Sequence, residues 1–148
     1  MKIHALVVTA LVAGVVPALS LARPTAMHPE VGAKLSGKQE VPKGAPAGHG
    51  IVNVTLDAKK GTVCWHFEGI AGIGKPAAAH IHKAPLGKNG AVVVPFGEAY
   101  KAKGCTSAPK ATIEAIEAHP NSYYVNVHTA KYAGGAIRGQ LVAGMMQM

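Results

Sequence analysis

Two neighbouring stretches decide the fold class: HGIVNVTLD, residues 49–57, and GTVCWHFEGI, residues 61–70. In each of them apolar and polar residues alternate, and strict alternation is the pattern of a strand with one buried face. The turn-forming residues 57–61 lie between the two stretches. The sequence therefore predicts a β-hairpin whose inward side chains are Val52, Val54 and Leu56 on the first strand and Val63, Trp65 and Phe67 on the second.

Outward from this hairpin, the chain contains further short apolar segments separated by glycine and proline. They predict a short edge strand over 32–37 and strands over 77–83, 91–96, 122–129 and 136–143. The Val92–Val94 run is typical of a strand that is buried on both faces, or at one end. Ile113 and Ile116 lie at helical spacing, and Pro120 ends that segment, which predicts one short helix over 111–118. The spacing favours one all-β domain, an antiparallel sandwich or barrel.

The N-terminus has the pattern of an export signal. Lys2 precedes an apolar run over residues 5–22 that is short for a membrane span, and small residues offer cleavage after Ser20 or Ala22. We expect a signal peptide over 1–22 and one domain over 23–148, with no stable membrane span after cleavage. An uncleaved N-terminal anchor is the alternative. The expected location is the periplasm or the outside of the cell.

Cysteine count and charge agree with an exported, soluble domain. Cys64 and Cys105 are the two cysteines of the chain. In an oxidising compartment they predict one disulfide, although two buried free thiols are the alternative. The formal net charge is +8, but the lysines are scattered along the sequence. Nucleic-acid binding calls for clustered basic residues with aromatic platforms, so we expect no nucleic acid as a partner.

A histidine pair stands out in the predicted strand over 77–83. His80 and His82 are two residues apart, so on a strand they share a face and lie about 6.5–7 Å apart along it. His128 faces away from the core of its own predicted strand, as Tyr124 and Asn126 do. If the strands are neighbours, the three imidazoles converge on the solvent side of one wall and can hold a metal ion.

Arg138 and Gln140 are expected to extend the same polar wall from the last strand. The alternative is that all of these are ordinary polar residues on a solvated face. Three other histidines, His49, His66 and His119, fit surface positions better. The thioethers of Met145, Met146 and Met148 are soft ligands suited to cuprous copper, although a frayed C-terminal tail accounts for them more simply.

Motifs of common hydrolases and transferases are missing from the sequence. It contains no Gly-x-Ser-x-Gly, no phosphate-binding glycine loop and no paired carboxylates close in sequence to the histidines. With only seven acidic residues, acid–base hydrolysis is disfavoured. If the protein is an enzyme, the histidines point to a copper-dependent oxidoreductase.

Several ordered motifs resemble the CHRD domain first named in chordin. They cover Lys34 to Leu141 and comprise the segments 35–37 with 39–42, 79–83 with 87–90, 124–129 and 135–141. Ala84 and Ala136 depart from the family pattern. The resemblance implies a β-sandwich domain that is also found in many small exported bacterial proteins.

A fainter resemblance, to copper-zinc superoxide dismutase, concerns the order of the histidines. It implies a Greek-key barrel, superoxide-dismutase-like or immunoglobulin-like in architecture, with His80, His82 and His128 where copper ligands stand. No counterpart of the bridging histidine or of the zinc ligands is present, so the resemblance implies at most a mononuclear site. Arg138 would then hold an anion near the metal, or form an ordinary surface salt bridge.

These observations lead to one functional hypothesis and two alternatives. We expect an exported protein that binds, buffers or delivers copper through three histidines, with zinc as the competing ion. The first alternative is a metal-free interaction module whose binding face contains Tyr124, Asn126 and Arg138, with an unknown protein partner. The second is redox catalysis at the copper.

Overall fold

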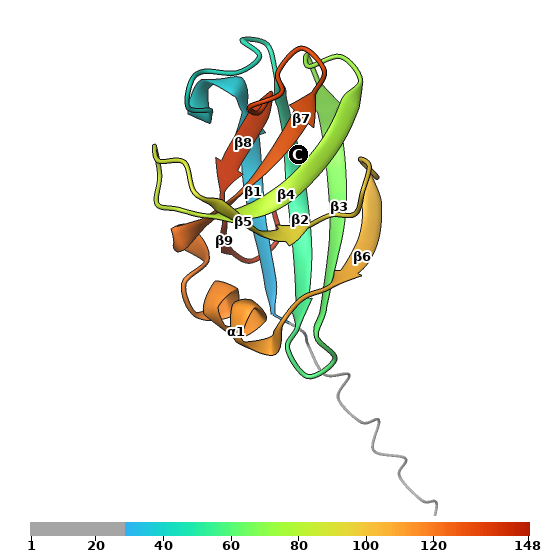
Figure 1. The fold of residues 1–148 in the computed structure, drawn as a ribbon, viewed down its shortest axis with the longest axis vertical. Coiled ribbons are helices and arrows are strands. Elements are labelled where there is room, and N and C mark those ends of the chain that lie inside the picture. Colours follow the sequence, from blue (N-terminus) through green and yellow to red (C-terminus); the bar gives the residue numbers. More distant parts are fainter. Residues whose placement is uncertain (1–28) are drawn as a thin grey trace, which may run out of the picture.

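The computed structural model describes residues 29–148, which form one antiparallel β-sheet curled into a nearly closed barrel (Figure 1). The predicted signal peptide over 1–22 lies outside the described residues. Within the described part there is one α-helix, α1 (Lys110–Ala118). The strands are β1 (Glu30–Ser36), β2 (His49–Asp57), β3 (Thr62–Ala71), β4 (Pro76–Lys83), β5 (Ala91–Pro95), β6 (Lys103–Ser107), β7 (Tyr123–Thr129), β8 (Ile137–Gln140) and β9 (Val142–Ala143).

The strand order around the barrel is β5-β4-β7-β8-β1-β2-β3-β6, and β9 pairs with β1. Three neighbouring pairs, β4–β7, β8–β1 and β3–β6, are distant in sequence, as in Greek-key folds. The chain between β5 and β6 spans the remaining gap, because its backbone bonds to β4 at one end and to β3 at the other. These hydrogen bonds run from Phe96 N to Ala79 O, from Tyr100 N to Ala77 O and from Phe67 N to Ala102 O.

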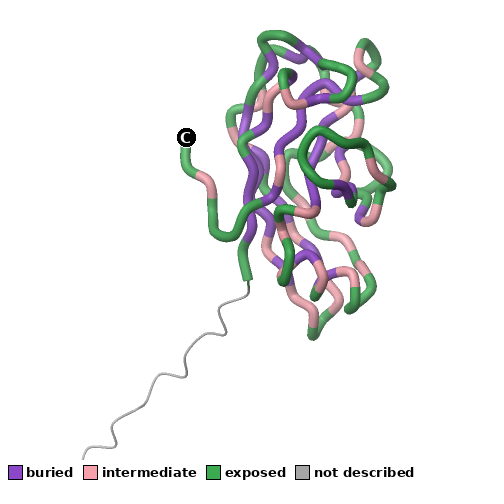
Figure 2. The backbone as a smooth tube through the Cα atoms, turned by 90° about the vertical axis from the view of Figure 1, so that its left-hand side faces the viewer, coloured by how far each residue is buried: buried purple, intermediate pink, exposed green. Residues whose placement is uncertain are grey.

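The predicted hairpin is confirmed as β2 and β3, which pair antiparallel over most of their length. Their predicted inward side chains are all buried and belong to the barrel core, which Figure 2 shows as the purple stretches of the tube. The predicted helix is confirmed as α1, which lies at the lower end of the barrel in Figure 1. Ile113 and Ile116 are fully buried and join that core.

Two strand predictions differ from the structure, and one strand was not predicted. The predicted edge strand over 32–37 is wrong in position: β1 lies inside the sheet, hydrogen-bonded to β2 on one side and to β8 and β9 on the other. The valine run of β5 lies at one end of the sheet order, with Val92 47% exposed, so this strand is not buried on both faces. The strand β6 was not predicted, because its sequence, KGCTS, has no apolar alternation.

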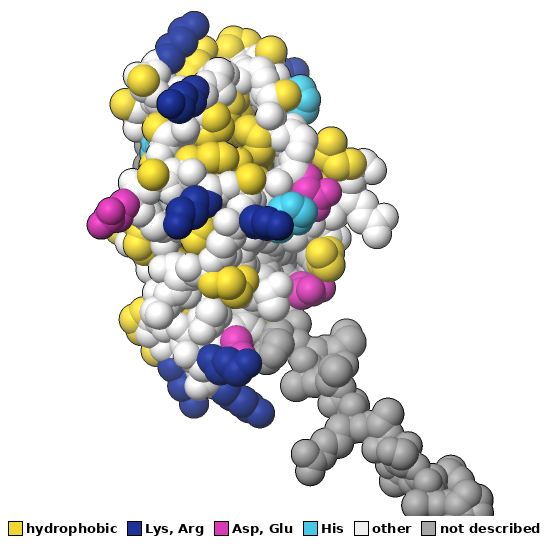
Figure 3. Space-filling model, turned by 90° about the vertical axis from the view of Figure 1, so that its right-hand side faces the viewer, with side chains coloured by type: hydrophobic (Ala, Val, Ile, Leu, Met, Phe, Trp, Pro, Cys, Tyr) yellow, Lys and Arg dark blue, Asp and Glu magenta, His cyan; other side chains and the backbone are white. Residues whose placement is uncertain are grey.

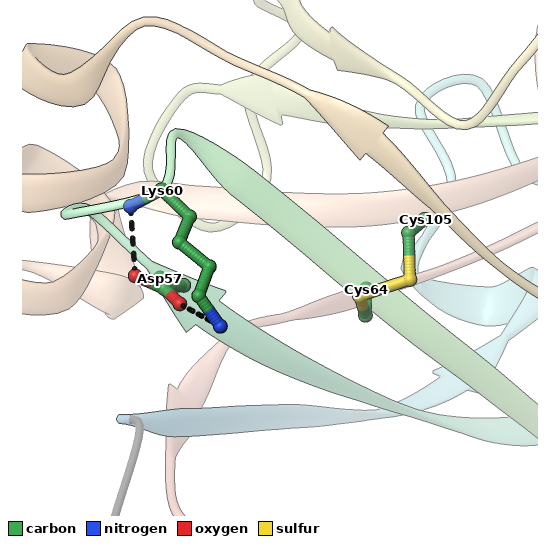
Figure 4. The surroundings of a disulfide bond; sticks show 4 residues. All are labelled: Asp57, Lys60, Cys64 and Cys105. Atoms are coloured by element: carbon green, nitrogen blue, oxygen red, sulfur yellow. Dashed lines mark hydrogen bonds and ion pairs between the residues drawn. A yellow bond between two sulfur atoms is a disulfide. The ribbon is translucent and has the colours of Figure 1, made fainter. Parts of the chain in front are cut away.

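The disulfide prediction is confirmed. Cys64 and Cys105 are directly opposite each other on β3 and β6 and are joined by a disulfide, with their Cα atoms 4.0 Å apart (Figure 4). The bond links β6 to the central hairpin, which is consistent with folding in an oxidising compartment. The same view shows the turn of the hairpin, where the backbone N–H of Lys60 donates to Asp57 Oδ1 over 2.9 Å.

The C-terminal segment lies against the outside of the sheet rather than fraying away from it. Asn53 points out of the barrel yet is only 6% exposed. Its side-chain amide donates to the carbonyl of Met146 over 3.1 Å and accepts from the Met146 N–H over 2.6 Å. Figure 2 shows this segment as a mostly exposed tube beside the sheet.

Within residues 29–148, no helix has the length and apolar character that crossing a membrane requires. On the face drawn in Figure 3, the lysine and arginine side chains are spread from one end of the molecule to the other.

Candidate metal centre

Strand pairing brings the three predicted histidines together. The strands β4 and β7 are antiparallel neighbours, with His80 opposite Asn126 and Ala78 opposite His128. Because Ile81, Val125 and Val127 face the core, the histidines lie on the outer face of the barrel. One ring nitrogen from each of His80, His82 and His128 lies within 4.8 Å of those of the other two.

The closest of these contacts matches the spacing of two ligands on one ion. His80 Nδ1 is 3.2 Å from His128 Nε2. Two nitrogens bound at about 2.0–2.1 Å to a tetrahedral ion lie roughly 3.3–3.4 Å apart. His128 Nδ1 donates to the carbonyl of Ala133, 2.8 Å away, and His128 Nε2 also lies 3.0 Å from Asn126 Oδ1. An ion bound to both rings would lie between His80 Nδ1 and His128 Nε2.

His82 is oriented by its other nitrogen. Its Nδ1 donates to the carbonyl of Gly90 over 2.9 Å, which places the lone pair of the neutral ring on Nε2. This Nε2 is fully buried and makes no hydrogen bond of normal geometry, although the nearby Asn126 side chain acts to raise the pKa of His82. Donation from the second ring nitrogen to a carbonyl is how proteins hold metal-ligating histidines in the correct tautomer.

Burial favours the neutral form of two of these histidines, His80 and His82. The pKa of His80 is lowered from 6.5 to about 4, mainly by burial and further by the nearby rings of His128 and His82. Burial also lowers the pKa of His82, and the hydrogen bond to Gly90 opposes that shift. Neutral imidazole is the form that binds a metal ion, so the lowered pKa values of His80 and His82 favour binding by these two rings.

The polar wall is covered, and the prediction that it faces solvent is wrong. Tyr124 and Asn126 are each only 2% exposed, and Arg138 is 3% exposed. Two segments far away in the sequence, residues 37–45 and 84–90, contribute the groups that contact this wall. The faces of β7 and β8 are nevertheless as predicted, because Tyr123, Val125, Val127, Ile137 and Leu141 belong to the core.

Arg138 is at the centre of this covering layer. Its Nε donates to Glu40 Oε2 over 2.7 Å, Nη1 donates to the carbonyl of Lys88 over 3.0 Å, and Nη2 donates to Asn89 Oδ1 over 2.6 Å. The guanidinium also lies over the ring of Tyr124, 4.3 Å from its centroid. Tyr124 in turn stacks on His82, with ring centroids 4.8 Å apart. These contacts bind Arg138 to groups of the protein itself, and its ion pair with Glu40 is buried rather than on the surface.

Glu40 is the residue near the site that the sequence analysis did not single out. It is 3% exposed, and burial raises the pKa of its carboxyl group despite the attraction of Arg138. Gly135 lies against the carboxylate, where a Cβ atom would overlap it. Glu40, Lys88 and Asn89 all fall within the motifs of the CHRD resemblance, and that was the available signal for them.

The other sequence candidates stay apart from the cluster. His49, His66 and His119 are exposed. His66 lies 3.5 Å from a carboxylate oxygen of Glu68, and His49 Nδ1 donates to Ala47 O. Within residues 29–148, the three predicted histidines make up the one group of three or more His, Cys, Asp or Glu side chains placed to share an ion.

Fold and site together define a class: a small disulfide-bonded antiparallel β-barrel with a three-histidine cluster on its outer wall. The chain matches the family model of the CHRD domain over residues 31–141. It therefore belongs to the CHRD domain family, which confirms the principal resemblance seen in the sequence. No curated protein and no solved structure matches the chain, so neither comparison supports the fainter resemblance to superoxide dismutase.

Proposed function

We propose that this protein is an exported metal-binding protein that holds copper through His80, His82 and His128 and that buffers or delivers the ion. Export is supported by the disulfide and by the signal pattern of the N-terminal sequence. Three imidazoles also suit zinc, which is the competing ion. Copper(II) is favoured because it binds a given set of nitrogen ligands more tightly than zinc does.

The observation that carries the proposal is the buried Nε2 of His82. A buried polar atom without a partner costs roughly 1–3 kcal/mol, so such atoms are rare in folded proteins unless they have a role. Here the unpartnered atom carries a lone pair, its tautomer is held by Gly90, and it lies beside ring nitrogens of His80 and His128. An ion bound to all three would provide the missing partner.

The surroundings fit a bound ion better than an exposed interaction face. His80 and His128 are half-buried, so the ion would be reachable from solvent on one side. Tyr124, Asn126 and Arg138, which the alternative of a metal-free interaction module requires at the surface, are buried. A protein that exchanges its ion needs an accessible coordination position, and this arrangement leaves one.

The proposal is tested by titrating the metal-free protein with Cu²⁺ and with Zn²⁺, followed by calorimetry and, for copper, by electron paramagnetic resonance. We expect one ion per chain, copper bound more tightly than zinc, and a spectrum of nitrogen ligation. His82→Ala should abolish stoichiometric binding, whereas His66→Ala, on another face, should leave it unchanged. Absence of stoichiometric binding by the wild-type protein would overturn the proposal.

A further inference from the structure

The loop that accepts the hydrogen bond of His82 is itself bonded to other parts of the chain. This loop, residues 84–90, follows β4 directly, and its last residue accepts the hydrogen bond from His82 Nδ1. The N–H of the same Gly90 lies 3.4 Å from the hydroxyl of Tyr124, the ring that stacks on His82. The position of Gly90 therefore determines both the tautomer and the packing of His82.

Side chains of β8 contact the loop at both ends. Gln140 Nε2 donates to the carbonyl of Ala84 over 2.8 Å at its beginning. Near its end, Arg138 binds the carbonyl of Lys88 and the side chain of Asn89. Asn89 also donates from Nδ2 to the carbonyl of Val41 over 2.8 Å, which connects the loop to the segment 37–45.

Asn89 is unusual because it is exposed, yet both ends of its amide are bonded. One bond is to a buried cation, and hydrogen bonds to charged groups are the stronger kind. The neighbouring Leu86 is 69% exposed, and Gly87 adopts a positive φ of 76°. The pairing of Lys83 with Ala91 and the bonds of Ala84 and Lys88 to β8 restrain this loop, and the bonds of Asn89 add to them directly beside Gly90.

We propose that Asn89 is a positioning residue: by fastening the loop 84–90 to Arg138 it keeps Gly90 O on His82 Nδ1 and thereby aims Nε2 at the ion. The part that concerns the ion rests on the proposed function. Without the hydrogen bonds of Asn89 to Arg138 and Val41, the carbonyl of Gly90 leaves His82, and the ring is free to turn or to move its proton to Nε2. Loss of such an outer partner typically weakens metal affinity about 10- to 100-fold.

The first test needs no metal. In the metal-free protein, long-range ¹H–¹⁵N spectra of the histidine rings report which nitrogen carries the proton. We expect the wild-type protein to show His82 protonated at Nδ1, and Asn89→Ala to show a mixture of tautomers with faster exchange of the ring proton. Leu86→Ala is the matched control, because its side chain takes no part in these hydrogen bonds, and it should resemble the wild type.

The second test measures copper affinity by competition with a chelator in the same variants. Asn89→Ala should bind Cu²⁺ about 10- to 100-fold more weakly, with an altered paramagnetic resonance spectrum. Leu86→Ala should stay within about twofold of the wild type. Asn89→Asp keeps an acceptor for Arg138 but loses the donor to Val41, so it should recover part of the affinity.

The outcomes distinguish the positioning role of Asn89 from the proposed binding of copper. If Asn89→Ala leaves the His82 tautomer and the copper affinity unchanged, Asn89 does not position His82, and the proposed function stays intact. Failure of the wild-type protein to bind copper would overturn the proposed function, and the ring spectra of the metal-free protein would still decide whether Asn89 positions His82.

Discussion

Histidines project from two outer faces of the barrel, and the two faces behave differently. On β3, His66 points outward and is exposed beside Glu68. On β4 and β7, His80, His82 and His128 also point outward, but they form a cluster beneath loops, and His82 is 9% exposed. Both faces follow from strand alternation, so alternation decides the direction of a side chain and not its surroundings.

The cause of the difference is what covers each face. Loop segments that contribute buried polar and charged groups cover much of the β7–β8 wall. The outer face of the hairpin is covered in part by the C-terminal segment, which Asn53 holds through backbone groups of Met146. A face becomes a candidate site when distant parts of the chain remove it from water and leave a polar atom without a partner.

The largest expected effect concerns the ion pair behind the β7–β8 wall. Arg138→Met leaves the buried carboxylate of Glu40 without its partner, and such losses cost about 3–5 kcal/mol. Lys60→Ala removes the ion pair between the exposed Lys60 side chain and Asp57 on the hairpin turn and should cost at most about 1 kcal/mol. Urea denaturation of the metal-free variants at neutral pH measures both free energies of unfolding.

A double variant checks that the cost comes from the orphaned charge. Glu40→Leu combined with Arg138→Met should recover part of the stability that the single variant loses, because no charge then stays buried alone. If Arg138→Met were as mild as Lys60→Ala, the distinction between a covered and an open face would be lost.

The second prediction concerns the disulfide between β3 and β6. Replacing Cys64 and Cys105 by serine should lower the free energy of unfolding by about 2–4 kcal/mol, because the unfolded chain loses a constraint across 41 residues. Copper affinity should stay unchanged, since β4 and β7 carry the histidines. Denaturation and copper competition on the same samples test both statements, and weakened copper binding in a folded variant would contradict the second.

A smaller effect is expected for Asn53→Ala. It removes two hydrogen bonds to the backbone of Met146, each contributing about 0.5–1.5 kcal/mol. The C-terminal segment should then detach, which amide hydrogen exchange at Met146 would detect as lost protection. Thr55→Ala, a polar-to-alanine change on the same face of β2, is the control. Equal protection of Met146 in both variants would show that Asn53 does not hold the segment.

The last prediction concerns the dependence of stability on pH. The pKa of His80 is about 4 in the folded protein and 6.5 without the fold, so the unfolded chain binds the proton more readily. The contribution of His80 to the free energy of unfolding of the metal-free protein is therefore fully present above about pH 6.5 and is lost as the pH falls toward 4. Ring-proton titration by NMR should place His80 near 4, and a midpoint at 6.5 would contradict the burial of this ring.

Much of the fold could be predicted from local patterns. The alternation at Val52, Val54 and Leu56 marks a strand with one buried face whatever the rest of the chain does, and the hairpin appears where that pattern puts it. The helical spacing of Ile113 and Ile116 has the same local character. The edge position expected for β1 is wrong, because a strand's neighbours depend on pairings with β8 and β9, more than a hundred residues away.

The candidate site was likewise only partly predictable from the sequence. The shared face of His80 and His82 follows from their spacing of two, and the outward direction of His128 follows from the alternation of β7. The burial of this wall beneath loops could not be predicted from the sequence, because Glu40 and Asn89 bond to Arg138 from about fifty to a hundred residues away. Their polar character alone predicts exposure, which is the usual position of such residues.

By itself, then, the sequence determined most of the strands, the helix and the direction in which the clustered histidines point, because backbone geometry imposes these within a few residues. The tertiary structure decided which strands are neighbours, how close the three imidazoles come and which charges lie beneath the loops. Those features depend on contacts between segments distant in the chain, and burying Arg138 against Glu40 is favourable only when the whole barrel brings the two together.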